Sequence, residues 1–576
     1  MRLGYSRSKY TTSYYAQKTI YVNGKNTSLI VKRFGSEKYI CETYGVSDAK
    51  AWAQEQINLM NQAEKEEKAD ALLSLSPGKD LPPDQQRCFN GGYLFLQDIY
   101  YALGIDKICR AIAKKHSFEY NLNSILSRLI YSRILYPSSK LNTYQEAAKF
   151  IEPPDFELHQ IYRALSVIAK ESDYIQSTLY KNSMKLCKRK TGVIYYDCTN
   201  FYFEIEQAED DKQYGLSKEN RPLPIVEMGL FMDAEGIPLA FCIEPGNTNE
   251  QVTMVPLEKK LLSDFGMSKF VVCTDAGLSS NDNRKFNYYD KEDGSRAFVT
   301  TQSVKKLKKH LKDWVLSPEG WHLSGDTEKK VYNISKLDEK KEEDKIFFKS
   351  RWIKENGLEQ QLIVSYSIKY RNYMRTIRDG QIERALKAVE KGSSGVEKKR
   401  QTDYHRFIKT KHATKDGEVA DRKVHYIDAT LVQKEEMYDG FYAVCTNLED
   451  EAEAVVKINQ RRWEIEECFR IMKSELEARP VYLHRKERIL AHFITCFIAL
   501  IVYRYLEKRI GEKYTCNRTI DCLKEMNFVK YEGKGYVPTY TRTELTDDLH
   551  KEFGFCTSKE IIPIKKMRNI CAQTKK

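Results

Sequence analysis

The sequence lacks a CxxC pair, an apolar N-terminal run and a long hydrophobic stretch without charge. Its 14 cysteines are scattered, mostly inside apolar runs, which indicates buried, reduced thiols rather than a zinc site or a disulfide framework. The N-terminus, MRLGYSRSKY, has no apolar core and so does not have the pattern of a signal peptide. The longest apolar run, at 489–506, contains His492 and Arg504 and predicts a buried helix. We therefore expect a cytoplasmic protein with no membrane partner.

Positive charge is in modest excess. The 576 residues include 94 Lys and Arg against 81 Asp and Glu, which gives a formal net charge of +13. This excess favours a polyanionic partner such as nucleic acid, although many basic proteins bind none specifically. The chain is longer than one ordinary core requires, so we expect about two to four domains.

The amino-acid composition and the spacing of apolar residues change several times along the chain, and these changes define the predicted regions. Short strand patterns, including 38–45, precede a charged helix, and a segment rich in proline then reads as a linker. The predicted regions are a small α+β region at 1–75, a linker at 76–87, a helical region at 88–190, a catalytic domain at 191–302 and 438–510, an insertion at 303–437 and a basic C-terminal region at 511–576.

The helical region at 88–190 is a candidate for binding DNA ends. Its segment FELHQIYRALSVIAK predicts a helix with His159, Gln160 and Arg163 off the apolar face. Two interpretations stay open, a helix-turn-helix that places its second helix in the major groove and a plain helical bundle.

The region from Gly192 onward predicts a mixed α/β sheet. GVIYYDCTNFYFEIE is rich in β-branched and aromatic residues, and PIVEMGLFMDAEGIPLAFCIEPG reads as two further strands joined by a turn. Alternating helix and strand patterns follow, which is typical of an α/β domain. The segment 303–437 is rich in lysine and mixes charged loops with strand-like pieces, so we interpret it as an insertion that interrupts the sheet domain.

The stretch NQRRWEIEECFRIMK, at 459–473, is the most informative of the chain. At 100° per residue, Arg462, Glu466 and Lys473 lie within about 40° of one another on one predicted helix. Glu466 falls at the edge of an apolar stripe, whereas Glu464 and Glu467 are predicted to point to solvent. Such charged pairs are often only a solvated face. The stripe consists of Ile465, Phe469, Met472 and Leu476.

Two aspartates follow apolar strand patterns. Asp197 ends the run VIYYD, and Asp275 ends the run FVVCTD. Sites of α/β proteins assemble at strand ends, although Asp275 precedes Ala276–Gly277 and could simply cap the next segment. With Glu466 these aspartates make three carboxylates on separate elements. Three carboxylates suit two-metal phosphoryl chemistry, because Mg²⁺ prefers hard oxygen ligands.

This pattern resembles the DDE triad of insertion-sequence transposases. The order Asp197, Asp275, Glu466 matches that triad, and the helix matches the signature Y-x2-R-x3-E-x6-K of the IS-four superfamily (IS-sixteen-thirty-four-like group), with Asn459 at the tyrosine position. DCTN and DAG are similar to the motifs around the two aspartates of this group. The resemblance covers about residues 190–510.

The resemblance implies a fold, an activity and partners. The fold would be a ribonuclease H-like α/β core, a mixed sheet with flanking helices, interrupted by a mainly β insertion and preceded by a helical region. The protein would be a DNA transposase of a bacterial insertion sequence that binds terminal inverted repeats, cleaves strands and transfers 3′ ends to target DNA. It would use two Mg²⁺ or Mn²⁺ ions held by the triad and form a homodimer on DNA ends.

The resemblance also implies DNA contacts. Arg462 and Lys473 would bind phosphates, and Asn459 would contact DNA from the tyrosine position. Lys218 and Arg221, in the polar loop YGLSKENRP, are further candidates for phosphate contacts, with a solvated loop as the alternative. Two other functions stay open, a ribonuclease H-like nuclease without strand transfer and a non-catalytic DNA-binding descendant.

Overall fold

The computed structural model describes residues 1–8, 11–22, 25–68, 80–81, 83, 85–288, 296–326, 330–390, 403–413 and 422–576. The chain divides into two compact units, Met1–Gln85 with Glu532–Lys534 and Gln86–Tyr531 with Gly535–Lys576. The division after Gln85 falls inside the predicted linker at 76–87, most of which lies outside the described residues.

The N-terminal unit is a three-stranded antiparallel sheet with two helices. The segment 38–45 was predicted as a strand, but residues 38–44 belong to a helix. The Ser36 side chain caps this helix by accepting a hydrogen bond from the Tyr39 N–H (3.3 Å), and Gly45 ends it at a φ of 64°. The elements are β1 (Arg2–Arg7), β2 (Thr12–Val22), β3 (Lys25–Ser36), α1 (Glu37–Tyr44) and α2 (Ala49–Lys68).

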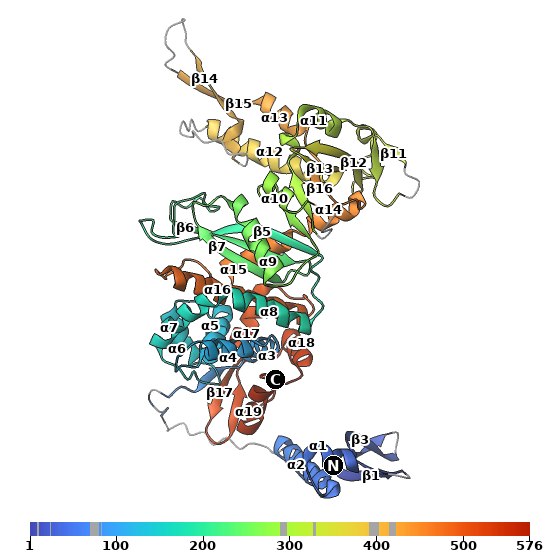
Figure 1. The fold of residues 1–576 in the computed structure, drawn as a ribbon, viewed down its shortest axis with the longest axis vertical. Helices are drawn as coiled ribbons and strands as arrows, with labels where there is room; N and C mark the ends of the chain where they lie inside the picture. Colours follow the sequence, from blue (N-terminus) through green and yellow to red (C-terminus); the bar gives the residue numbers. More distant parts are fainter. Residues whose placement is uncertain are drawn as a thin grey trace. The chain divides into compact units, whose positions relative to one another are not determined.

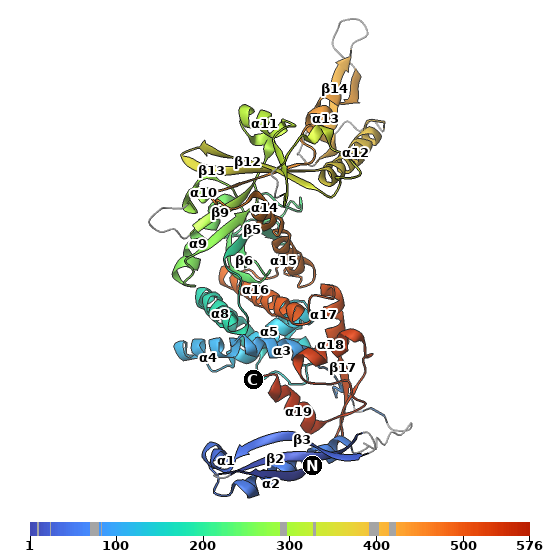
Figure 2. The ribbon, with the colours of Figure 1, turned by 90° about the vertical axis from the view of Figure 1, so that its right-hand side faces the viewer.

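The second unit contains a layer of helices built around α16 (Lys486–Arg509), which packs against three of them, α3, α5 and α7 (Figures 1 and 2). Among the described residues α16 is the helix long and apolar enough to cross a membrane, but 89% of its most apolar window is buried inside the protein. The prediction of a buried core helix is therefore confirmed. The layer consists of α3 (Tyr93–Ala102), α4 (Ile105–Lys115), α5 (Leu122–Leu135), α6 (Lys140–Ala147), α7 (Leu158–Lys170) and α8 (Ser172–Leu186).

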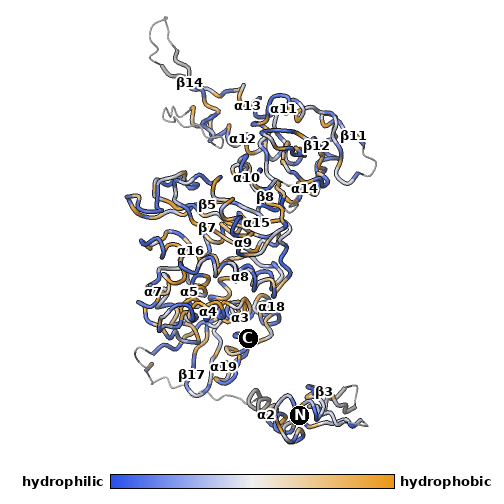
Figure 3. The backbone as a smooth tube through the Cα atoms, in the orientation of Figure 1, coloured by the Kyte–Doolittle hydropathy of each residue, from blue (hydrophilic) through white to orange (hydrophobic). Residues whose placement is uncertain are grey.

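This helical layer is hydrophobic along α3 and α5, as the colouring of Figure 3 shows. Nearly every residue of α5 is buried, because the helix has α3, α4, α6 and α16 as neighbours. The short strand β4 (Cys88–Asn90) precedes the layer and pairs with a strand from the C-terminal region.

A mixed sheet forms the other half of the second unit. Its strands follow the order β9-β8-β5-β6-β7, in which β5, β6 and β7 are antiparallel and β8 and β9 run parallel to β5. The predicted mixed α/β sheet is thus present. The elements are β5 (Val193–Tyr202), β6 (Ile225–Asp233), β7 (Pro238–Pro245), η1 (Glu250–Val252), α9 (Met254–Ser263), β8 (Phe270–Thr274), α10 (Asn281–Phe286) and β9 (Arg296–Gln302).

The predicted insertion continues this sheet. Beyond β9 the strand order is β9-β16-β13-β12-β10-β11, in which β10 to β13 belong to the segment 303–437 and β16 follows that segment. The segment therefore shares the mixed sheet and adds helices to it. The elements are η2 (Val304–Lys306), α11 (Lys309–Leu316), β10 (Trp321–Leu323), β11 (Val331–Tyr332), η3 (Ile334–Lys336), β12 (Ile346–Glu355), β13 (Leu358–Ser367), α12 (Ile368–Glu390), η4 (Tyr404–Phe407), β14 (Ile408–Ala413), β15 (Arg422–Ile427), α13 (Ala429–Glu436) and β16 (Phe441–Thr446).

The signature stretch forms two helices rather than the single one predicted. A turn at Arg461 and Arg462 separates α14 (Ala452–Gln460) from α15 (Trp463–Ser474). The C-terminal region folds back onto β4 through β17 and forms a four-stranded sheet. Its elements are α17 (Cys516–Glu525), β17 (Asn527–Tyr531), β18 (Gly535–Pro538), α18 (Glu544–Phe553), β19 (Ile562–Pro563) and α19 (Ile564–Gln573).

Candidate active site

The two predicted aspartates lie on neighbouring parallel strands. The register pairs Tyr195 of β5 with Cys273 of β8, and continuing it by two residues sets Asp197 opposite Asp275. Neighbouring strands lie about 4.8 Å apart, so the two carboxylates share one small region. Asp197 was predicted at the end of a strand, but it lies inside β5, beside the end of the shorter strand β8.

Asp197 is a half-buried carboxylate whose charge is only partly balanced. Burial raises the pKa of Asp197 to about 6, and the negative charge of Asp275 adds to the rise, while Lys218 and Arg462 oppose it. Its carboxylate accepts a hydrogen bond from the Cys198 N–H at 2.8 Å. Asp275 is thus close enough to Asp197 to affect its charge.

Asp275 organises the turn that follows β8. Its Oδ1 accepts hydrogen bonds from the backbone N–H groups of Gly277 and Leu278, both at 2.9 Å. Within the described part of the chain, Oδ2 makes no hydrogen bond. The turn-capping role considered from the sequence is therefore real, and it leaves the second oxygen available as a ligand.

Helix α15 packs against β5 and buries a wider arc than the predicted stripe. Cys468 and Ile471 are also buried, and at 100° per residue they lie on the side of the helix that carries Glu464. Glu464 is consequently buried (8% exposed), which corrects the prediction that it points to solvent. Glu466 lies on the opposite edge of the arc and is exposed, and it makes no hydrogen bond or ion pair with any described residue.

Glu464 has a structural role. Its carboxylate pairs with Arg461 (3.1 Å) and Arg504 (3.8 Å), so its buried charge is balanced. Gly236, at a φ of 74°, makes room for this cluster, because a Cβ there would lie 2.3 Å from both Glu464 Oε2 and the Arg504 guanidinium. Glu467 pairs with Arg470 (2.6 Å) and takes no part in the acidic pair.

Two cations flank Glu466 on its edge of α15. Arg462 and Lys473 both act electrostatically on groups of the site: Arg462 lowers the pKa of Asp197, and Asp197 raises that of Lys473. Burial and the nearby Lys218 nevertheless bring the pKa of Lys473 down to about 8. Lys473 also lies 5.5 Å from the ring of Phe201, on the face of β5 shared with Asp197. The edge that carries Glu466 therefore borders the acidic pair.

The polar loop after β5 contributes Lys218 to the site. Its Nζ contacts the Cys198 carbonyl and pairs with Glu250 at 2.9 Å. Burial alone would lower the pKa of Lys218, but Asp197 and Glu250 outweigh it and raise the pKa. Arg221 lies farther out and covers the ring of Tyr202 at 4.3 Å.

Asn459 does not reach the surface. It is 2% exposed, and its side-chain amide donates to the Tyr442 hydroxyl and to Thr301 Oγ1 (3.2 Å). These bonds tie α14 to β16 and β9. A DNA contact by Asn459 does not fit this burial, because its side-chain amide is hydrogen-bonded to Tyr442 and Thr301 inside the core and is not accessible to a phosphate.

Sequence reasoning missed one carboxylate beside the site. Glu227 of β6 is 3% exposed, and its Oε2 is buried without a hydrogen-bond partner among the described residues. Burial and the nearby Glu250 raise the pKa of Glu227 to about 7, against the opposing effect of Lys218. The sequence held the same signal that marked the aspartates, a carboxylate inside the apolar run PIVEMGLF.

The acidic pair has the chemistry of a hard-cation site. Two close carboxylates, one with a free oxygen and one with a raised pKa, are stabilised by a divalent ion that neutralises both. Among the described residues no three acidic, His or Cys side chains stand close enough to hold a metal together. Glu466 therefore borders the acidic pair without joining it in one cluster.

Comparison with known proteins adds a family match. Residues 357–502 match the family described as Transposase DDE domain, a range that includes Glu466 but neither aspartate. No curated protein matches the chain. The match supports a DDE transposase, a class of enzymes that cleave and join DNA.

Two solved structures are distantly similar. A piggyBac transposase synaptic complex with hairpin DNA is 8% identical, with 84% of each chain covered and a TM-score of 0.36. A Mos1 transposase paired-end complex with left transposon end is 12% identical, covers 43% of this chain and 68% of its own, and has a TM-score of 0.13. At these TM-scores neither likeness carries an argument about function.

Proposed function

We propose that the protein is a DNA transposase of a bacterial insertion sequence, of the IS-four superfamily, that cleaves at terminal inverted repeats and joins the freed 3′ ends to target DNA. The single observation that supports it most is the acidic pair, Asp197 and Asp275, on adjacent parallel strands beside the helix that carries Glu466. We further propose a cytoplasmic homodimer that holds two DNA ends.

In this proposal the acidic pair and Glu466 hold Mg²⁺ or Mn²⁺. When bound, two such ions lower the pKa of the attacking water or 3′-hydroxyl and stabilise the leaving oxygen. Asp197 must lose its proton to serve as a ligand. Although its pKa is raised, the value of about 6 is still below neutral pH, so the carboxyl group is mostly ionised there. Glu466 is exposed and unpaired, so it can turn toward the ions without breaking an ion pair.

The cations beside the acidic pair would position the DNA backbone. Arg462, Lys473 and Lys218 lie around Asp197 and can donate charge-assisted hydrogen bonds to phosphate oxygens. Arg221, at the rim, would add a phosphate contact without base specificity. DNA would therefore enter between the loop after β5 and α15.

The test is a cleavage and strand-transfer assay with the DNA that flanks the gene. With Mg²⁺ the protein should cut at the inverted repeats and yield joined products with target DNA. Cleavage without joining would instead identify a ribonuclease H-like nuclease. Binding of the ends without cleavage would identify a non-catalytic DNA-binding descendant.

A further inference from the structure

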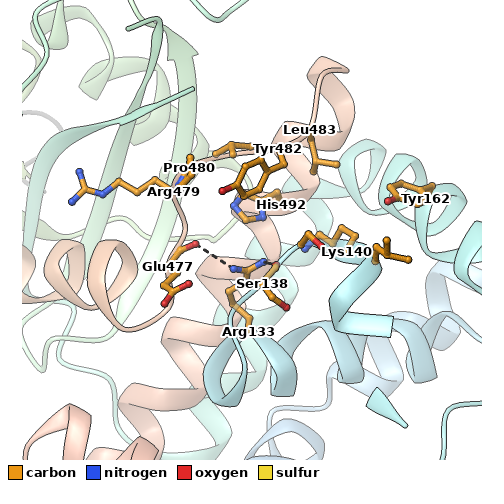
Figure 4. Close-up of a pocket in the computed structure, with 13 residues that line it drawn as sticks. Arg133, Ser138, Lys140, Tyr162, Glu477, Arg479, Pro480, Tyr482, Leu483 and His492 are labelled. Atoms are coloured by element: carbon orange, nitrogen blue, oxygen red, sulfur yellow. Dashed lines mark hydrogen bonds between the residues drawn. The ribbon is translucent and has the colours of Figure 1, made fainter. Parts of the chain in front are cut away.

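A cavity of about 140 Å³ lies between helices α5 and α6 and the segment that follows α15. Figure 4 shows the side chains of Arg133, Lys140 and His492 directed into the same space, whereas Arg479 points away from it. The cavity opens to solvent beside Leu141 and Tyr482, which are 50% and 66% exposed. It is separate from the acidic pair, none of whose residues lines it.

Lys140 is the unusual residue of this cavity. It is 5% exposed, and its Nζ is buried without a hydrogen-bond partner among the described residues. A buried ammonium without a partner is strongly destabilising, so such a group is normally paired or neutral. Burial and the nearby Arg133 lower the pKa of Lys140 to about 7, which relieves only part of this cost at neutral pH.

Arg133 adds a second buried charge that no acid balances. Its guanidinium donates to the carbonyls of Leu476 (3.3 Å), Glu477 (3.3 Å) and Ser138 (2.9 Å), and its Nε has no partner in the described part of the chain. Carbonyl groups satisfy the hydrogen bonds but leave the net charge in place. No ion pair joins Arg133 or Lys140 to a carboxylate of any described residue.

His492 and the start of α6 complete the wall. The His492 ring contacts the Ala478 carbonyl at 3.0 Å, and burial together with Lys140 and Arg133 keeps its pKa well below the usual range. Helix α6 begins at Lys140, with Ser139 as its cap, so the positive end of the helix dipole faces the same cavity. Arg133, Lys140 and the N-terminus of α6 favour an anion in this cavity, and the acidic residue of its lining, Glu477, is exposed.

We propose that this cavity binds a phosphate group. Its volume, equivalent to several water molecules, accommodates one tetrahedral oxyanion. Arg133 and Lys140 would supply charge-assisted hydrogen bonds, and the N-terminus of α6 would add the favourable dipole. The phosphate comes from a DNA backbone or from a free phosphate-bearing molecule, and both sources present the same chemistry. This site does not depend on the DNA-cleaving function proposed above.

Thermal unfolding of the full-length protein in inorganic phosphate, against chloride at equal ionic strength, tests the proposal. The Tm of the wild type should rise by about 2 °C or more in phosphate. Lys140→Met should abolish that rise, and in phosphate-free buffer it should be at least as stable as the wild type, because it removes an uncompensated buried charge. Lys181→Met, at an exposed lysine of α8, is the matched control and should respond like the wild type.

Three results would overturn the proposal. They are a wild-type Tm that does not respond to phosphate, a Lys140→Met variant that keeps the response, and a Lys140→Met variant that is less stable than the wild type without phosphate. A loss of DNA cleavage with an intact phosphate response would count against the catalytic proposal alone.

A second arm identifies the source of the phosphate. Fluorescence anisotropy of a labelled DNA duplex is measured with and without inorganic phosphate at constant ionic strength. Competition by phosphate in the wild type but not in Lys140→Met identifies a DNA backbone phosphate as the occupant. Duplex binding that phosphate leaves unchanged, with the Tm response retained, identifies a free phosphate-bearing molecule.

Discussion

The acidic pair and the phosphate cavity are two sites of opposite charge in the same unit, and their surroundings differ. Around Asp197 and Asp275 stand the cations Lys218, Arg462 and Lys473, so part of the charge is balanced within the protein. Around Lys140 and Arg133 no described carboxylate forms an ion pair. The first site can therefore persist without a ligand at a moderate cost, whereas the second gains more of its stability from an anion.

Removal of an acidic ligand should have the largest effect. Asp197→Ala, Asp275→Ala and Glu466→Ala should each lower metal-dependent strand cleavage by more than the roughly 10–100-fold typical of residues that only support a metal ligand. Binding of DNA ends, measured by gel shift, should stay detectable. Glu467→Ala is the control and should cut almost normally, because its ion pair with Arg470 is partly exposed. Retained cleavage in any of the three variants would remove that residue from the triad.

Glu464 is a buried carboxylate that pairs with two arginines, and it can be compared with the exposed Glu466. Glu464→Ala should lower the free energy of unfolding by about 1–3 kcal/mol, because it removes one of the two carboxylates beside the buried Arg504, which keeps its ion pair with Glu507. Glu466→Ala should change stability by less than about 0.5 kcal/mol. Denaturant unfolding of both variants measures the difference. Equal losses would mean that Glu466, and not Glu464 alone, is structural.

The raised pKa of Asp197 predicts a pH dependence. Because the folded protein raises the pKa of Asp197 to about 6, the protonated form stabilises the fold, and this contribution is lost as pH rises through about 6. Asp197→Asn has no charge to bury. Without metal, its free energy of unfolding relative to the wild type should therefore increase by about 2–3 kcal/mol as the pH rises from 4 to 7. Urea unfolding across this range tests the sign. A wild type that gains stability relative to the variant as pH rises would contradict it.

Asn459 should have the smallest effect on DNA binding. Asn459→Ala removes the hydrogen bonds to Tyr442 and Thr301 and should cost about 1–3 kcal/mol of stability. Its affinity for DNA ends should equal that of the wild type, since the amide is buried. A specific loss of DNA affinity with unchanged stability would restore the predicted DNA contact.

Local patterns were enough to find the acidic pair. Asp197 and Asp275 follow apolar strand residues, and the parallel register of β5 and β8 places them side by side. The same rule would have found Glu227 in β6. The assignment of Glu464 to solvent was wrong because four apolar residues defined the stripe, while Cys468 and Ile471 widen the buried arc on the side of Glu464.

The phosphate cavity could not be found in this way. Arg133 and the carbonyl of Leu476 are 343 positions apart, and neither flanking sequence has a phosphate-binding pattern. The break between α14 and α15 was also hidden, because Arg461 and Arg462 are good helix formers. In the fold α14 packs against β9 and α15 packs against β5. Tertiary contacts decide such features, and periodicity along the chain does not contain them.

Titration calorimetry with Mn²⁺ measures whether the acidic pair binds a divalent ion. The wild type and Lys140→Met should bind the ion with equal affinity at pH 7.5, and Asp197→Asn and Asp275→Asn should lose most of that binding. If both aspartate variants bind Mn²⁺ as tightly as the wild type, the acidic pair is not the metal site.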